Sequence, residues 1–351
     1  MYKILFIITK GQTGGAQKFV CEQIEILSGS YECYLSTNSR GWLSENTQEY
    51  VKDTLFDSGI EGVSLSYLIT LYKFIKKNKI DLVVCNSANG GLYGRIASFL
   101  SNTKSIYVTH GWSSVYNGGR FSFIFNFIET LLSFTTSSIL CISQNDYLIA
   151  KNKIKIPDHK LHVINNATIP FLGDIAFPES PEKQKYKLLT VARLSSPKRI
   201  DLLIDAVKEF QNVDLTVVGD GPDMSLLLNN VKSEKIKNVF FKGEVKSFQD
   251  FAHYDIFALI SESEGLPMSA IEAMSVGMPL ILSNVGGCPE LIRDSGMLVE
   301  NDIDDIKTGI SGSILKFSEF SVNSYDYYQD QFNLLKNISL FKDYYQSVIN
   351  K

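Results

Sequence analysis

Short apolar runs alternate along most of the 351-residue chain with segments whose apolar residues recur every three or four positions. This alternation is typical of parallel α/β units, in which each buried strand is followed by a helix. In the first half it predicts strands at Lys3–Thr9, Glu32–Ser36, Asp81–Asn86, Ser105–Thr109, Ser138–Ile142 and Leu161–Ile164. In the second half it predicts strands at Lys187–Val191, Asp214–Val218, Asn238–Lys242, Ile256–Ile260, Pro279–Ser283 and Met297–Val299.

A charged, Pro-containing stretch without clear periodicity separates the two halves. We therefore predict a Rossmann-like domain over residues 1–166, a linker over 167–186 and a second Rossmann-like domain over 187–330. A helical segment over 331–351 is expected to pack back on the first domain. Two doubly wound domains of this kind face each other across a cleft at the carboxyl ends of their strands, where the function is expected.

Composition and charge narrow the class of protein. Hydrophobic residues at 44% and charged residues at 21% are typical of a globular protein, and a formal charge of −4 argues against a nucleic-acid partner. Five scattered cysteines without a CxxC motif indicate reduced core residues in a cytoplasmic protein. The N-terminus is interpreted as a strand and not a secretion signal. Asn126 and Glu129 interrupt the longest apolar stretch, which favours a helix and a strand over a membrane span.

Candidate chemistry is densest between Ser261 and Glu290. Glu264 and Glu272 stand eight positions apart across Pro267. We expect Glu264 in a loop and Glu272 in a short helix that starts at Pro267, since Pro is favoured at the first helical position. A Gly-Gly loop then leads into a second helix that is expected to begin at Pro289. Two helix N-termini at one sheet edge would present free N–H groups and partial positive charge to a phosphate.

Two cations and a histidine follow other predicted strands. Arg193 and Lys198 come after the first strand of the second half, where they can neutralise a diphosphate, although a solvated loop is the alternative. His110 directly follows a strand and precedes Gly111, a position from which it can reach a ligand as donor or acceptor.

Glycines mark three further strand ends. Gly14 and Gly15 follow the first strand and allow a ligand to approach the backbone, but the run lacks GxGxxG spacing. The Gly-Asp-Gly-Pro sequence that starts at Gly219 is explained as a turn, and Gly243 leaves room for a base or ribose. We expect no metal site: Asp302 and Asp304 have the spacing of a metal-binding carboxylate pair, but they follow a short strand near the end of the chain.

Taken together, these stretches resemble the retaining glycosyltransferases of family 4, which share the two-domain GT-B fold. The resemblance extends from Gly14 to Glu290, and its most specific part is SxxEGLPxxxxEAMSxGxP, which contains both glutamates. Ala192 and Arg199 depart from the family pattern, which commonly has glycine at both places. The HGW and CISQND segments resemble those of enzymes that build bacterial surface polysaccharides.

The resemblance implies a nucleotide-sugar donor, with a UDP-hexose or UDP-N-acetylhexosamine favoured over GDP-mannose. It implies catalytic roles for His110, Glu264, Arg193 and Lys198, and places Gly15 and His110 on the acceptor side. Arg193 and Lys198 would hold the diphosphate, and Glu272 would accept the ribose hydroxyls. The implied donor-binding residues are Gly14, Gly15, Arg193, Lys198, Gly243, Glu244, Glu264, Gly265, Leu266 and Glu272.

The implied reaction is a retaining transfer, without metal or other cofactor, to a glycan or lipid-linked acceptor in surface-polysaccharide synthesis at the cytoplasmic face. Because no residue is an obvious covalent nucleophile, we prefer a front-face displacement over a covalent intermediate on Glu264. The basic segment Leu71–Lys79 is usually a solvated helix face, and the alternative is that it rests on anionic lipid.

Two rival functions share the donor. A nucleotide-sugar epimerase of the same architecture would need no acceptor, but the paired glutamates and the placement of Arg193 and Lys198 favour transfer. A binding subunit without activity is the second rival, and the presence of the complete residue set, His110 included, argues against it.

Overall fold

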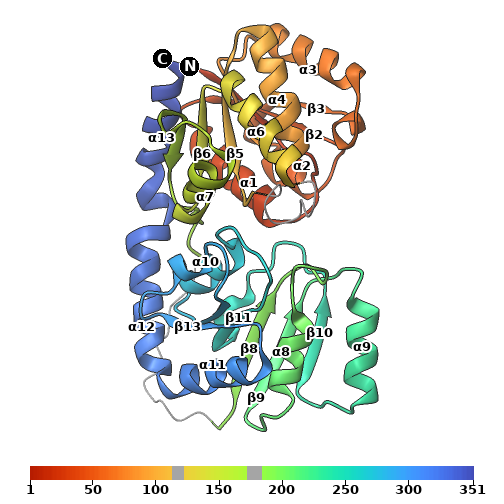
Figure 1. Cartoon of the computed structure of the whole chain (residues 1–351), viewed down its shortest axis with the longest axis vertical. Helices are drawn as coiled ribbons and strands as arrows, with labels where there is room; N and C mark the ends of the chain where they lie inside the picture. Colours follow the sequence, from red (N-terminus) through yellow and green to blue (C-terminus); the bar gives the residue numbers. More distant parts are fainter. Residues whose placement is uncertain (113–121, 172–183) are drawn as a thin grey trace. The chain divides into compact units, whose positions relative to one another are not determined.

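The computed structural model describes residues 1–112, 122–171 and 184–351, and these form two compact units. The first unit comprises Met1–Asn166 and Leu335–Lys351, and the second comprises Ala167–Leu334. Each unit is built around one parallel sheet covered by helices, which confirms the predicted α/β class (Figure 1). The predicted linker, residues 167–186, falls largely outside the described residues.

The sheet of the first unit has seven parallel strands in the order β3-β2-β1-β4-β5-β6-β7. Its strands are β1 (Lys3–Ile7), β2 (Glu32–Thr37), β3 (Val51–Phe56), β4 (Leu82–Asn86), β5 (Lys104–Thr109), β6 (Ser138–Cys141) and β7 (Leu161–Val163). The predicted strands of this half are confirmed within two residues at each end. We did not predict β3, because its sequence is largely exposed at the sheet edge and shows no apolar alternation.

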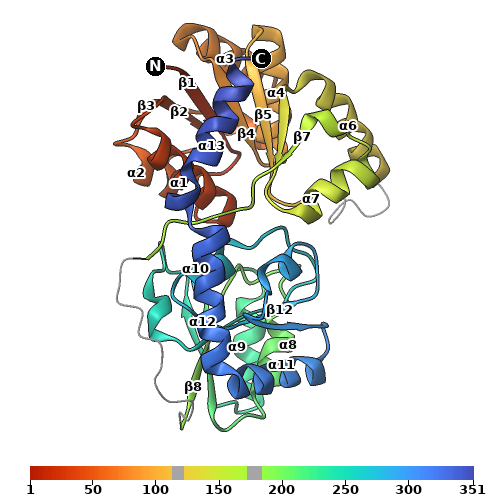
Figure 2. The same cartoon turned by 90° about the vertical axis from the view of Figure 1, so that its left-hand side faces the viewer.

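Helices cover both faces of this sheet (Figures 1 and 2). They are α1 (Gly15–Leu27), α2 (Trp42–Thr47), η1 (Ser58–Glu61), α3 (Leu65–Asn78), α4 (Ala88–Ser101), α6 (Ser122–Thr135), α7 (Gln144–Ile149), η3 (Ala150–Ile154), η4 (Asp158–Lys160) and α13 (Leu334–Ile349). Alternate strand residues such as Leu5 and Val83 share one buried core with Leu71 of α3 and Ala97 of α4. None of the helices in the described ranges is long and apolar enough to cross a membrane.

The C-terminal helix α13 packs on the first unit. Tyr345 Oη lies 3.1 Å from Gln23 Oε1, and Tyr344 Oη lies 2.8 Å from Ser138 Oγ. The ring of Phe341 also meets Phe19 of α1 edge to face. The two ends of the chain therefore share one core, and the second unit ends at Leu334, a few residues later than the predicted boundary.

The second unit repeats the architecture with six parallel strands in the order β10-β9-β8-β11-β12-β13. Its strands are β8 (Tyr186–Val191), β9 (Val213–Val218), β10 (Val239–Gly243), β11 (Ile256–Leu259), β12 (Leu280–Ser283) and β13 (Gly296–Val299), as predicted within one residue at each end. Its helices are α8 (Ile200–Val207), α9 (Met224–Ser233), η5 (Asp250–His253), α10 (Met268–Ser275), η6 (Cys288–Leu291), α11 (Ile303–Leu315), α12 (Phe317–Tyr327) and η7 (Tyr328–Phe332).

The strand order of each sheet locates its binding edge. The order reverses between β1 and β4 in the first sheet and between β8 and β11 in the second. In open parallel sheets, ligands bind beyond the carboxyl ends of the strands at this reversal, where the two connecting loops diverge. The loops after β1, β4, β8 and β11 are therefore the places where the candidate residues should gather.

Candidate active site

Lys198 and Glu264 form an ion pair at the reversal point of the second sheet. Lys198 follows β8, Glu264 follows β11, and Lys198 Nζ donates a hydrogen bond to Glu264 Oε1. The two side chains are only 19% and 9% exposed, so solvent screens this pair less than a surface pair. Arg193 lies on the same loop as Lys198 with an exposed side chain, and no ion pair of Arg193 is found among the described residues.

Backbone contacts between the two loops bring Lys198 and Glu264 together. The Arg199 N–H donates to the carbonyl oxygen of Ile260 at 2.9 Å, and the Glu262 N–H donates to that of Pro197 at 2.8 Å. Ser261 Oγ donates to the same Pro197 carbonyl at 3.2 Å. The loop after β8 is therefore fixed to the loop after β11 immediately beside the ion pair.

Two glycines pack directly against the backbone of these loops. Gly286 has φ +54°, and a Cβ at this position would overlap the carbonyl oxygen of Glu264. Gly219 has φ +135°, and a Cβ there would overlap the carbonyl oxygen of Ala192, next to Arg193. Only glycine combines a positive φ with so short a distance to a neighbouring carbonyl oxygen. These two glycines therefore position the charged loops through backbone contact.

Helix α10 begins directly after the Glu264 loop and carries Glu272, which is buried. Pro267, predicted as the first helical residue, is the N-cap, and the helix begins at Met268. The second predicted helix is only a four-residue 3₁₀ turn, η6, because the chain becomes extended at Ile292. Of the two predicted helix N-termini, α10 alone is a full helix that presents its first-turn N–H groups at this edge.

The remaining donor-side candidates flank this centre. Gly243 ends β10 with φ +70°, and its carbonyl oxygen accepts the Gly219 N–H at 2.8 Å. Glu244 beside it is exposed, whereas Leu266 is buried. Arg199, which departs from the family pattern, forms ion pairs with Asp201 and Glu262 instead of facing Glu264.

In the first unit, His110 and Asn86 meet at the carboxyl edge of the sheet. His110 follows β5, Asn86 ends β4, and His110 Nε2 lies 2.8 Å from Asn86 Oδ1. Asn86 Nδ2 donates to the Val84 carbonyl at 3.3 Å, which turns Oδ1 toward the imidazole. Nε2 must then carry the proton, so Nδ1 keeps a free lone pair that can accept a hydrogen bond. The sequence did not single out Asn86, because the pairing of β4 with β5 is what brings it beside His110.

The loops after β1 and β4 are joined at the same edge. Ser87 Oγ accepts the Thr9 N–H at 3.1 Å and lies 2.7 Å from Thr9 Oγ1. Ser87 has φ 65° and ψ 167°, a conformation that is almost confined to glycine. Such strain persists only where surrounding contacts enforce it, and it clusters at functional sites. Gly14 and Gly15 begin α1 after the same β1 loop, and Gly15 is exposed.

The two segments that resemble surface-polysaccharide enzymes contact each other. Trp112 of the HGW segment is buried, and its Nε1 donates to the carbonyl oxygen of Asp146 at 2.9 Å. Ser143 Oγ caps α7 by accepting the Asp146 N–H at 3.0 Å. The Trp112–Asp146 contact therefore joins the loop after β5, which carries His110, to the loop after β6.

Burial keeps His110 neutral near physiological pH. It lowers the pKa of His110 from 6.5 to about 4, and the ring of Phe19 packs against the imidazole with centroids 5.1 Å apart. A neutral imidazole can accept a hydrogen bond from a sugar hydroxyl through Nδ1, but it adds no positive charge to the site.

This shift predicts a loss of stability in acid. The unfolded chain binds the His110 proton near pH 6.5 and the folded chain only near pH 4, so unfolding is favoured as the pH falls between these values. The effect on the free energy of unfolding reaches at most roughly 3 kcal/mol. We expect the melting temperature of His110→Gln to fall less than that of the wild type between pH 6.5 and pH 4. His159→Gln, which replaces an exposed histidine, is the control. An unchanged slope in His110→Gln would contradict the burial effect.

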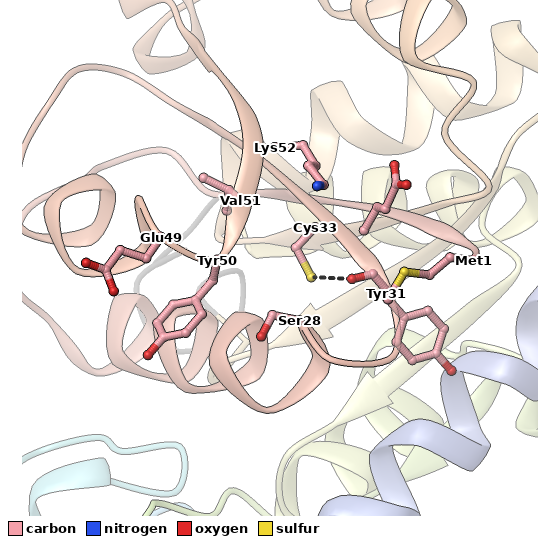
Figure 3. A pocket seen from close by; sticks show the side chains of 9 residues that line it. Met1, Ser28, Tyr31, Cys33, Glu49, Tyr50, Val51 and Lys52 are labelled. Carbon is pink, nitrogen blue, oxygen red and sulfur yellow. Dashed lines mark hydrogen bonds between the residues drawn. The ribbon is translucent and has the colours of Figure 1, made fainter.

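A separate hollow of about 340 Å³ lies elsewhere in the first unit (Figure 3). Its lining includes Cys33 and Val51, which lie at the amino-terminal ends of β2 and β3, the sheet edge opposite to His110. Burial raises the pKa of the Cys33 thiol to about 12, so it is no nucleophile. None of the sequence-predicted site residues lines this hollow, and we assign it no part in the reaction.

The amino-acid sequence matches two glycosyltransferase family models, one in each half of the chain. The model for Glycosyltransferase Family 4 matches residues 13–169, and that for Glycosyl transferases group 1 matches residues 174–316. The O-antigen biosynthesis glycosyltransferase WbnH of Escherichia coli is 39% identical over 308 residues, which cover 87% of this chain and 88% of WbnH. The UDP-Gal:alpha-D-GlcNAc-diphosphoundecaprenol alpha-1,3-galactosyltransferase of Escherichia coli is 24% identical over 96% of this chain and 95% of its own.

Solved structures show the same fold. The crystal structure of HepE from Anabaena in complex with UDP and glucose has a TM-score of 0.83 and 22% identity, and covers 99% of this chain and all of HepE. This likeness confirms the two-domain GT-B fold expected from the sequence. With its strand order, its glutamate motif and a relative at 39% identity, the chain belongs to the group 1 glycosyltransferases of family 4, and the protein is a glycosyltransferase.

Proposed function

We propose that the enzyme is a retaining, metal-independent glycosyltransferase that moves a hexose or N-acetylhexosamine from a UDP-sugar to a lipid-linked saccharide in the synthesis of bacterial O-antigen. The ion pair of Lys198 and Glu264, set at the reversal point of the second sheet beside α10, carries this proposal. The names of the relatives support it, since one belongs to O-antigen biosynthesis and another transfers galactose from UDP-Gal to GlcNAc-diphosphoundecaprenol.

The charges of the second unit suit a leaving nucleoside diphosphate. Negative charge grows on the phosphate oxygen as its bond to the sugar breaks, and Lys198, Arg193 and the first-turn N–H groups of α10 can stabilise that charge. Charge-assisted hydrogen bonds of this kind contribute roughly 1.5–3 kcal/mol each. Glu272, one turn into α10, is proposed to accept the ribose hydroxyls of the donor.

We propose a front-face displacement. The acceptor hydroxyl bonds to the anomeric carbon on the face from which the diphosphate departs, and the departing phosphate oxygen takes the hydroxyl proton, so the configuration is retained. Glu264 holds the Lys198 ammonium in place, and a carboxylate engaged in this way is a poor covalent nucleophile. His110 is proposed to accept a hydrogen bond from a sugar hydroxyl through Nδ1.

Donor binding should raise thermal stability. We expect UDP and UDP-sugars to stabilise the enzyme in EDTA, by about 2.7 kcal/mol when the ligand is present at 100 times its Kd. Thermal unfolding of the enzyme with a panel of nucleoside diphosphates and their sugars measures this. Stabilisation by guanosine diphosphate alone would overturn the choice of nucleotide, and dependence on added Mg²⁺ would overturn metal independence. Inversion of the anomeric configuration, seen by NMR of the product, would overturn retention.

A peripheral position at the inner face of the plasma membrane follows from a lipid-linked acceptor and is part of the proposal. The structure changes the part that α3 can play in it. In the basic segment Leu71–Lys79, Leu71 and Ile75 are buried in the core, so this segment presents mainly its lysines to a lipid surface. The exposed apolar residues of α3, Leu65 and Ile69, lie in its first two turns, before that segment. Lys73, Lys76 and Lys77 are exposed, and Lys79 follows the helix as its C-cap.

A further inference from the structure

Helix α6 is built with its polar side toward the protein. Asn126, Glu129, Thr130 and Ser133 recur at helical spacing on one face. The Glu129 carboxylate accepts two hydrogen bonds from the guanidinium of Arg95 in α4, at 2.8 and 3.2 Å, and Arg95 is fully buried. Thr130 Oγ1 also donates to the Ile154 carbonyl of η3 at 2.7 Å. The single charge of α6 is therefore neutralised inside the unit.

The opposite face of α6 is exposed and apolar. Seven of its fourteen residues are large hydrophobic side chains that are 38–68% exposed, where the outer face of a globular helix is normally polar. Phe99 and Leu100 of helix α4, which packs against α6, are also exposed, by 64% and 57%. We call the nine residues the apolar surface: Phe99, Leu100, Phe123, Ile124, Phe125, Phe127, Ile128, Leu131 and Phe134. A contiguous exposed face of this kind marks an interaction site.

Lysines border the apolar surface on two sides. Helix α3 packs against α4 and α4 against α6 (Figures 1 and 2). Helix α6 in turn packs against η3, so the four elements follow one another in a row. Lys73, Lys76 and Lys77 are exposed on α3, and Lys153 and Lys155 are exposed in and after η3. Lys151 of η3 is paired with Asp158, but no acidic partner of Lys153 or Lys155 is found in the described part of the chain.

We propose that the apolar surface enters the headgroup region of an anionic bilayer, with α6 lying along the membrane and the flanking lysines on lipid phosphates. Apolar insertion and attraction to anionic lipid together hold helices of this type at an interface. A second copy of the chain fits less well, because the apolar surface has no acidic side chain to meet the lysine borders of a partner. The inference goes beyond the proposed function, since it names the docking surface and does not depend on the sugar transferred.

Vesicle flotation of the purified full chain tests the proposal without donor or acceptor. We expect the enzyme to float with vesicles that contain phosphatidylglycerol and to remain largely unbound with phosphatidylcholine alone. The double variant Phe127→Gln, Leu131→Gln should lose at least tenfold in bound fraction. Leu226→Gln, Leu228→Gln is the matched control, because these leucines of α9 are 69% and 44% exposed on the second unit.

Three results would overturn the proposal: equal loss in both double variants, full binding by the α6 variant, or a wild-type dimer that the α6 variant splits into monomers. Raising the salt concentration should weaken binding to the anionic vesicles, and binding that ignores salt would contradict a role for the lysines. UDP should raise the melting temperature of the α6 variant as much as that of the wild type. This readout separates failure of the membrane surface from failure of the proposed donor site.

Discussion

Replacing Lys198 with alanine should lower the turnover of sugar transfer by roughly 10²–10³-fold, the effect of removing one donor that stabilises developing negative charge. Its ammonium is held by Glu264 at the reversal point of the second sheet, where the leaving diphosphate is proposed to lie. The charge it stabilises is greater in the transition state than in the bound donor. The loss should therefore appear mainly in kcat and less in the KM for the donor, which steady-state kinetics separates.

Arg199→Ala is the matched control for this experiment. It removes a positive charge one position away, but Arg199 pairs with Asp201 and Glu262. We expect its turnover to stay within a few-fold of the wild type, and a common melting temperature would show that both variants are folded. Normal turnover in Lys198→Ala would refute the diphosphate assignment.

A double variant tests the role of Glu264. In Lys198→Ala its carboxylate is left without its cation beside the proposed phosphate site, so part of the lost rate reflects repulsion. The double variant Lys198→Ala, Glu264→Gln should therefore be more active than Lys198→Ala alone. A covalent mechanism on Glu264 makes the opposite prediction, because the amide cannot form the intermediate and the double variant would be inactive.

Apolar periodicity was sufficient to locate twelve of the thirteen strands that the described residues form, because parallel strands buried on both faces form continuous apolar runs. It failed for β3, which lies at a sheet edge with exposed side chains and so carries no such run. The same periodicity placed Lys198 and Glu264 after strands, but not beside each other. Their contact depends on backbone hydrogen bonds between loops more than sixty residues apart, such as Arg199 to Ile260.

The sequence also could not predict residue roles that depend on packing between elements. Asn86 ends an ordinary apolar strand, and only the pairing of β4 with β5 brings it to His110. The longest apolar stretch was correctly predicted as a helix and a strand, α6 and β6, but periodicity alone could not tell which face of α6 is buried. The buried Arg95 decides this, because it requires the Glu129 carboxylate as its partner.

We expect the second large effect from Gly286→Ala. This substitution displaces the backbone and does not remove a charge. The added Cβ would overlap the Glu264 carbonyl oxygen, and φ +54° is unfavourable for alanine by about 1–2 kcal/mol. Backbone cannot yield as a flexible side chain can, so the Glu264 loop must move. We expect the second unit to lose about 3 kcal/mol of stability, which lowers its melting temperature by roughly 6–12 °C. A displacement of Glu264 by about 1 Å would lower kcat/KM by roughly 10²-fold.

Gly243→Ala separates the two causes of this effect. Gly243 belongs to the same unit and also has a positive φ of +70°, but a Cβ there meets no atom of the structure within 4 Å. Gly243→Ala should therefore lose only the stability that backbone strain explains, about 1–2 kcal/mol, which lowers the melting temperature by roughly 2–8 °C. If Gly286→Ala is destabilised no more than Gly243→Ala, the overlap with Glu264 is relieved without cost. The glycine loop would then not be what positions the Lys198–Glu264 pair, and the lost rate would have to come from elsewhere.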